Sequence, residues 1–193
     1  MRKIILASAS PRRKELLEKI GLNFEVDASD GEEKIDLGLE PCTVVRQLSI
    51  DKAKSVAARH PDAVIIAADT IGVIGKKILG KPHTANEAAK MLREISGKSH
   101  LVITGFTLLD TANNRMFTGT VSTVVHIKKL TGEEIEAYVK TGEPLDKAGA
   151  YAIQGLGAVI VEKIEGDYYN VMGLPLNALT EAMKDFGINI WNN

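Results

Sequence analysis

The sequence predicts an α/β fold, and three observations point to it. Segments with the period of a strand alternate along the chain with segments that have the period of a helix. Residues 63–68 (AVIIAA) form a continuous apolar run, which is typical of a strand buried on both faces. Thr84 with Glu87, and Thr131 with Glu134, have the spacing of capping boxes, which mark the starts of two helices.

The first third of the chain begins with a strand and two helices. Residues 2–7 are apolar after the first two positions and predict a strand. Ser10 is expected to cap a helix over residues 11–20, because proline suits the first helical position and Gly21 then stops the helix. Residues 43–60 predict a second helix, which leads into the buried strand.

The remaining elements follow from turn and cap signals. A polar turn at 111–114 separates two runs of strand period, and residues 142–173 hold six glycines, which indicates loops. The expected order is a hairpin at 75–77, a helix over 84–95, strands at 100–109 and 116–128, a helix over 131–140, a strand at 157–164 and a helix over 175–186.

Composition excludes several classes of protein. The 193 residues, with 45% hydrophobic and 25% charged, suit one globular domain over 1–193. Lysine and arginine number 24 against 25 acidic residues, so we expect no nucleic-acid partner. Cys42 is the only cysteine, which precludes an intramolecular disulfide. No run approaches the roughly 20 apolar residues of a membrane span, and the apolar N-terminus is too short for a signal peptide, so we expect a cytoplasmic protein.

The start of the first predicted helix is a candidate phosphate site. Arg12 and Arg13 lie in the first turn, where the partial positive charge of the helix disfavours them. An anion there would reverse the penalty, because it would receive backbone N–H groups, guanidinium groups and the hydroxyl of Ser8 or Ser10. The alternative is that Ser10 only caps the helix and both arginines are solvated. The spacing alone leaves both interpretations open.

Lys52 interrupts an apolar face of the second predicted helix. Val44, Val45, Leu48 and Val56 form one arc at 100° steps, and Lys52 falls in the middle of it. A lysine in such a place most often extends past the edge of the core. The alternative is that its ammonium group points into a pocket that holds an anion.

Asp69 follows the apolar run 63–68 directly. Ligands of open α/β sheets bind at the carboxyl ends of strands, so we expect Asp69 there, followed by Thr70. A carboxylate in that position can hold a divalent cation or act as a general base. The alternative is a structural aspartate that bonds a turn.

Other motifs are weaker. Residues 75–82 (GKKILGKP) resemble a phosphate-binding loop but end in Pro82, which lacks the hydroxyl that would bind magnesium. Lys81 can still contact phosphate as a point charge. The four histidines have no metal-ligand spacing, whereas Glu32 or Glu33 adds a carboxylate. With no nucleophilic triad apparent, the residues indicate metal-assisted phosphate chemistry.

Six motifs in order resemble the Maf family of nucleoside triphosphate pyrophosphatases. They cover almost the whole chain, which makes the resemblance specific. The motifs are LASASPRRKELL (6–17), AADT (67–70), ILGKP (78–82), ISGKSHLVITG (95–105), PLDKAGAYAIQGLGA (144–158) and NVMGLPL (170–176).

The resemblance implies a fold and a reaction. The fold is a mixed α/β fold of the inosine-triphosphatase type, with a long, curved sheet, flanking helices and a cleft between two lobes. The reaction breaks a nucleoside triphosphate between its α and β phosphates and needs a divalent cation, Mg²⁺ or Mn²⁺. A homodimer is also implied by the resemblance alone.

The resemblance also implies site residues. Glutamine at 154, within DKAGAYAIQG, is similar to the subfamily that prefers dTTP and UTP, whereas a second subfamily, specific for 7-methyl-GTP, typically carries glutamate. Glu33 is the implied metal ligand, although Glu32 stays an alternative because Gly31 departs from the family pattern. The matching positions are Ser8, Arg12, Arg13, Glu33, Lys52, Asp69, Thr70, Lys81 and Gln154.

These positions divide into roles that the resemblance implies. Asp69 would take a proton from the attacking water, or hold the metal together with Glu33. The other implied residues would bind the substrate. A different class of function stays open: because the family name derives from septum formation, the chain can instead be a nucleotide-binding regulator of cell division whose catalysis is incidental.

Overall fold

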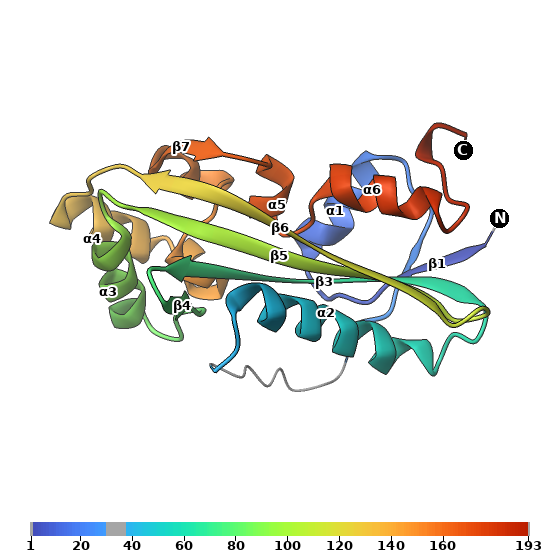
Figure 1. Ribbon diagram of the computed structural model, residues 1–193. Helices are drawn as coiled ribbons and strands as arrows, with labels where there is room; N and C mark the ends of the chain where they lie inside the picture. The colour runs from blue at the N-terminus through green and yellow to red at the C-terminus, as the bar shows by residue number, and fades with distance from the viewer. Residues whose placement is uncertain (1, 30–37, 193) are drawn as a thin grey trace. The chain divides into compact units, whose positions relative to one another are not determined.

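The computed structural model describes residues 2–29 and 38–192 (Figure 1). These residues divide into two compact units. Three of the divisions fall inside strands β3 (Ala63–Ile74), β5 (Ser99–Asp110) and β6 (Arg115–Ile127), and the fourth lies between residues 172 and 173. Of the described residues, unit 1 comprises 2–29, 38–69, 104–121 and 173–192, and unit 2 comprises 70–103 and 122–172. The prediction of one domain over 1–193 stays a prediction, as does the cleft.

The strands form a mixed sheet, which confirms the predicted mixed α/β class. The remaining strands are β1 (Lys3–Leu6), β2 (Glu25–Val26), β4 (Lys77–Leu79) and β7 (Val161–Glu165). The hydrogen-bonded order is β2-β1-β3-β5-β6-β7, and β4 pairs with β3. Strand β1 is parallel to both β2 and β3, whereas the β3–β4 and β6–β7 pairs are antiparallel.

Six α-helices and four short 3₁₀ helices lie in the described part of the chain. The α-helices are α1 (Pro11–Lys19), α2 (Pro41–Ala57), α3 (Ala85–Ile95), α4 (Gly132–Lys140), α5 (Tyr168–Met172) and α6 (Leu176–Lys184). The 3₁₀ helices are η1 (Glu143–Asp146), η2 (Ala148–Ala150), η3 (Gly155–Val159) and η4 (Ile190–Asn192). None of the helices described for residues 2–29 and 38–192 has the length and apolarity that a membrane crossing needs.

Unit 1 packs helix α2 on one side of its strands, with α1 and α6 on the other (Figure 1). Its buried cluster combines residues of β1, α2, β3 and β5, namely Ile5, Ala7, Ala53, Val56, Ala63, Ile65, Ala67 and Leu109. Gly105 of β5 lies against the α2 backbone, since a Cβ there would be 2.4 Å from the carbonyl oxygen of Val45. Ser49 of α2 and Thr107 of β5 share a buried hydroxyl hydrogen bond of 2.8 Å.

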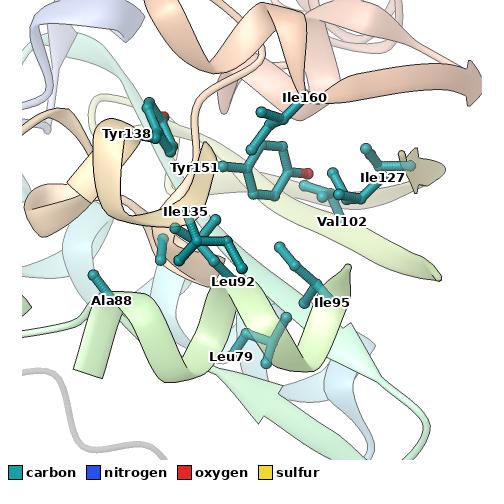
Figure 2. Packing of buried hydrophobic residues seen from close by; sticks show 12 residues of the cluster. Leu79, Ala88, Leu92, Ile95, Val102, Ile127, Ile135, Tyr138, Tyr151 and Ile160 are labelled. Atoms are coloured by element: carbon teal, nitrogen blue, oxygen red, sulfur yellow. The ribbon is translucent and has the colours of Figure 1, made fainter. Parts of the chain in front are cut away.

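Unit 2 has its own core, which Figure 2 shows from close by. Helices α3 and α4 contribute Ala88, Leu92, Ile95, Ile135 and Tyr138, which pack with strand residues and with Tyr151. The capping box that opens α4 is complete, because Thr131 and Glu134 each accept a backbone N–H of the other.

Several predicted details are wrong. Ser10 precedes α1, but its side chain makes no capping hydrogen bond, and its backbone N–H donates to the hydroxyl of Ser8. Thr84 caps α3, yet Glu87 bonds the backbone of His83, one residue before the cap, so this box is half formed. The predicted strand 157–164 begins only at Val161, since the glycine-containing residues before it form η3.

Candidate active site

A tight turn joins β1 to α1 and brings Ser8 against Arg13. The hydroxyl oxygen of Ser8 accepts the backbone N–H of Ser10 at 3.2 Å and the Nη1 of Arg13 at 3.1 Å. Both side chains are buried, with exposed fractions of 6% for Ser8 and 9% for Arg13. Because these two bonds use the acceptor capacity of the oxygen, the hydroxyl proton of Ser8 can be donated to an oxygen of a ligand.

The two arginines of the turn differ in their surroundings. Arg13 is fixed from two sides, because its Nε also donates to the carbonyl oxygen of Gly173 at 2.8 Å. Arg12 is half-buried in the same first turn and makes no ion pair with a described carboxylate. The first turn of α1 holds no acidic residue, so Arg12 and the helix N–H groups together present positive charge.

Lys52 and Asp69 form an ion pair in unit 1. The ammonium group of Lys52, on α2, donates to Oδ1 of Asp69, on β3, and the two side chains are only 14% and 9% exposed. Lys52 therefore does not extend past the core into solvent. It directs its charge to a carboxylate of the protein, which is a partner that the sequence did not indicate.

Asp69 does not lie at the end of its strand, and that prediction is wrong. Strand β3 continues to Ile74, because beyond Asp69 it pairs with β4 from Gly72 onward. Its parallel neighbour β1 ends earlier, with Leu6 opposite Ile66. The parallel part of the sheet thus ends just before Asp69, so the carboxylate still lies close to the carboxyl end of the parallel strand β1.

Three further predicted residues lie outside unit 1. Thr70 follows Asp69 in β3 and is half-buried, Lys81 is exposed just after β4, and Gln154 is half-buried directly before η3. These three belong to unit 2. Glu32 and Glu33 lie outside the described residues.

The chemistry of the donor atoms fits a hard cation held jointly with phosphate. Among residues 2–29 and 38–192 no group of three or more histidine, cysteine, aspartate or glutamate side chains lies close enough together to hold a metal ion. Asp69, within β3, supplies a carboxylate, whose oxygen atoms are donors of the kind that such a cation prefers. Magnesium is commonly bound by one or two carboxylates that act together with the phosphates of a substrate.

Sequence reasoning missed two contacts beside predicted residues, one in each unit. Gly173 offers its carbonyl oxygen to Arg13, and its only signal was its place within the NVMGLPL motif. Glu143 accepts the backbone N–H groups of Leu156 and Gly157, just beyond Gln154. A glutamate that precedes a glycine-rich stretch has no spacing that predicts such a contact.

The chain is similar to one protein family and to named relatives along nearly its full length. The family model described as Maf-like protein matches residues 3–186. A dTTP/UTP pyrophosphatase of Methanococcoides burtonii is 52% identical over 100% of both chains. Proteins with the same name are 46% identical in Desulforamulus reducens, over 98% of this chain and 100% of that protein, and 47% identical in Bacillus cereus, over 98% of both.

A solved structure, the Ham1 protein of Staphylococcus aureus, aligns with 83% of this chain and 80% of its own length. The TM-score is 0.49 and the sequence identity is 12%, a likeness too low to bear on the fold. The fold assignment therefore rests on the strand order and pairing of the chain itself.

Proposed function

The chain belongs to the Maf family, and from that premise we propose that it hydrolyses dTTP and UTP to the nucleoside monophosphate and pyrophosphate. The observation that carries the proposal is the match of 46–52% identity over nearly the whole chain to proteins named for this activity. The start of α1 supports phosphate chemistry independently of those names, because Arg12 and the helix N–H groups lie there with no acidic residue in the first turn.

The cations of the chain bind the triphosphate. Arg12 and the N–H groups at the start of α1 attract phosphate oxygens, and Ser8 donates its hydroxyl proton to one of them. Arg13 holds Ser8 in place for this contact, which its bonds to Ser8 and Gly173 support. Lys52, Thr70 and Lys81 add further donors to the phosphates, as the family resemblance implies.

Asp69 is the catalytic carboxylate of this proposal. It accepts a proton from the water that attacks the phosphorus, while the bond between the α and β phosphates breaks and pyrophosphate leaves. Asp69 would also hold Mg²⁺ or Mn²⁺ together with Glu33, which lies outside the described residues. When bound, such an ion neutralises charge on the phosphate oxygens.

Gln154 reads the base. Uracil and thymine present a carbonyl acceptor beside an N3–H donor, and a glutamine amide offers the complementary donor and acceptor. A glutamate at this position would be an acceptor only when ionised, and it would suit the adjacent donors of guanine. Buried polar groups left unpaired cost about 1–3 kcal/mol, which is enough to separate pyrimidine from guanine nucleotides.

One assay tests the proposal. Purified protein with Mg²⁺ should release pyrophosphate and UMP from UTP, and pyrophosphate and dTMP from dTTP, faster than it acts on GTP or 7-methyl-GTP. Removal of the cation with a chelator should abolish release, and added Mg²⁺ should restore it. Formation of UDP and inorganic phosphate instead would contradict the proposal, as would equal rates with all four nucleotides.

A regulatory protein of septum formation is the weaker alternative. The full-length relatives carry the name of an enzyme, which favours catalysis over nucleotide binding alone. The same assay separates them, because a regulator whose catalysis is incidental would bind UTP with little turnover. A cytoplasmic location, a homodimer and the lack of a nucleic-acid partner stay predictions.

A further inference from the structure

Glu143 lies in a cradle of hydrogen-bond donors within unit 2. Its Oε1 accepts the N–H of Gly157 at 2.8 Å and the hydroxyl of Tyr138 at 2.8 Å, and its Oε2 accepts the N–H of Leu156 at 3.0 Å. Successive backbone N–H groups in a glycine-containing turn form a concave site that favours anions. Here a carboxylate of the chain itself fills that site.

The turn around Glu143 requires glycine at two positions. Gly155 has φ +67°, and a Cβ there would be 2.6 Å from Oε2 of Glu143. A Cβ on Gly157 would be 2.4 Å from the carbonyl oxygen of Ala152 and 2.5 Å from the hydroxyl oxygen of Tyr138. The backbone after Gln154 therefore closes tightly around the carboxylate, and its shape depends on that carboxylate.

The cradle is tied to the core of unit 2 through Tyr138. The ring of Tyr138 belongs to the buried cluster, with Ile135 one turn earlier on α4 (Figure 2). Its hydroxyl donates to Glu143 and accepts the N–H of Ala152 at 3.3 Å. Partial burial acts to raise the pKa of Glu143, yet the bonds from Tyr138, Gly157 and Leu156 outweigh it and lower the pKa overall, which keeps the carboxylate ionised.

We propose that Glu143 is a positioning residue for base selection, which fixes the turn 155–157 and thereby the side chain of Gln154 that immediately precedes it. The inference rests on the proposed function of Gln154 as the residue that reads the base. Glu143 itself touches no substrate in this proposal. Its effect reaches the substrate only through the backbone of the turn.

The test combines activity with a measurement that needs no substrate. Glu143→Ala removes all three acceptor contacts. Glu143→Gln keeps the shape of the side chain but places an NH₂ group against a backbone N–H donor. Glu136→Ala, an exposed glutamate on α4, is the matched control. Amide hydrogen exchange at Leu156 and Gly157 reports directly on the turn.

We expect exchange at these two amides to accelerate roughly tenfold or more in Glu143→Ala, because each loses a charge-assisted hydrogen bond. The value of kcat/KM for UTP should fall on the order of 10- to 100-fold, as displacement of a binding group by about 1 Å can cause. The value for GTP should fall much less, so that the selectivity ratio drops. The control should match the wild type in every measurement.

A double-mutant cycle separates positioning from a general loss of structure. In a Gln154→Ala background, Glu143→Ala should have little further effect on the ratio of UTP to GTP, because both changes remove the same interaction. Additive losses would overturn the proposal. If Glu143→Ala does not fold, Tyr138→Phe tests the same cradle by removal of one hydroxyl.

The outcomes distinguish this proposal from the proposed function. If the wild-type protein does not hydrolyse UTP, the proposed function fails and the base-selection role of Glu143 fails with it, whereas faster exchange alone would retain Glu143 as the holder of the turn. If the wild type is active, unchanged exchange or an unchanged ratio of UTP to GTP in Glu143→Ala overturns the role of Glu143 only.

Discussion

The carboxylate of Asp69 is paired within the protein, because the ammonium group of Lys52 donates to it and both side chains are nearly buried. The two charges cancel, which explains how a carboxylate can lie beside the apolar residues of β3. In the proposed reaction the phosphates compete with Asp69 for the ammonium group. Substrate binding would then release the carboxylate for catalysis.

Replacement of Asp69 by asparagine should abolish most turnover and retain nucleotide binding. Loss of a general base typically lowers the rate on the order of 10²- to 10⁴-fold. The measurement is kcat for UTP beside the Kd of a non-hydrolysable UTP analogue, with Asp62→Asn, an exposed aspartate, as the control. Turnover near the wild-type value in a folded Asp69→Asn protein would remove Asp69 from the mechanism.

Removal of Lys52 should destabilise the protein through Asp69. In Lys52→Met the carboxylate loses its ammonium partner while most of it is buried, and breaking a buried pair costs about 3–5 kcal/mol. The double variant Lys52→Met/Asp69→Asn should recover most of that loss, because the uncompensated charge is gone. Thermal melts of the wild type, both single variants and the double variant provide the test. Purely additive changes in Tm would show that the pair does not contribute as a unit.

The two neighbouring arginines should separate into different effects. Arg13→Ala removes the hydrogen bonds that the guanidinium group donates to the Gly173 carbonyl and to the buried Ser8 hydroxyl, and it should lower stability by about 1–3 kcal/mol. Arg12→Ala should leave the Tm nearly unchanged and raise KM for UTP roughly tenfold, through loss of a charge-assisted contact to phosphate. Thermal melts and the steady-state kinetics of UTP hydrolysis, measured for both variants, test this assignment. A large drop in Tm for Arg12→Ala would contradict the assignment.

At the scale of elements, the start of α1 and the packing of α2 determine where the charged side chains lie. Helix α2 must approach β5 closely, and Gly105 permits this because it has no Cβ to meet the Val45 carbonyl. This close contact sets the distance between α2 and the sheet. That distance determines where Lys52, on α2, lies relative to β3.

Gly105→Ala should therefore be costly although alanine is small. The new Cβ would be 2.4 Å from a backbone oxygen, which cannot move without displacing α2. Overpacking of this kind costs about 1–3 kcal/mol, and for a chain of this length Tm falls by roughly 2–4 °C per kcal/mol. Gly132→Ala is the control, since a Cβ at Gly132 meets only open space. Equal melting temperatures for both variants would show that α2 can adjust.

Helix positions were predictable from sequence because their start signals are local. The capping pair of Thr131 with Glu134 lies within one turn, and the structure confirms it. The extent of β3 was not predictable, because the polar residues Asp69 and Thr70 follow the apolar run directly and so suggest the end of the strand. Pairing with β4 nevertheless continues the strand. Pairing between strands leaves no signal in the few neighbouring residues from which a local prediction is made. The same reason explains the error at 157–160, where η3 replaces a strand.

At the scale of the whole molecule, sequence identified the charged residues better than it identified their partners. The positions of Ser8, Arg13, Lys52 and Asp69 followed from local pattern. Their partners did not, because Lys52 bonds a residue 17 positions away and Arg13 bonds Gly173, which lies 160 positions away. Nothing in the spacing of Lys52 and Asp69 predicts that one neutralises the other. Partners of this kind follow only from the packed structure.

One buried histidine should set how the stability of the whole molecule depends on pH. His100, 4% exposed, bonds the Tyr151 hydroxyl through Nε2 at 2.9 Å and meets its ring edge to face. Burial first, and then the charge of His126, lowers the pKa of His100 from 6.5 to about 4. The folded state thus holds His100 neutral at a pH where the unfolded chain binds a proton.

The free energy of unfolding is therefore unaffected by His100 above pH 6.5. It decreases by about 3 kcal/mol in total as the pH falls toward 4, because the unfolded chain then binds a proton that the folded state does not. Arg59 and Arg2 hold the pKa values of Asp27 and Asp110 well below the ordinary 3.8. The stability that these two carboxylates contribute is therefore lost only at still lower pH. Urea unfolding between about pH 7 and 5.5 reports mainly on the histidine, because the pKa values of Glu134, Glu143 and Glu165, which hydrogen bonds lower from 4.5, affect stability only nearer that pH. His100→Gln should flatten the decline over this range, whereas the exposed His83→Gln should keep the wild-type slope. If His100→Gln keeps that slope as well, another group governs acid stability.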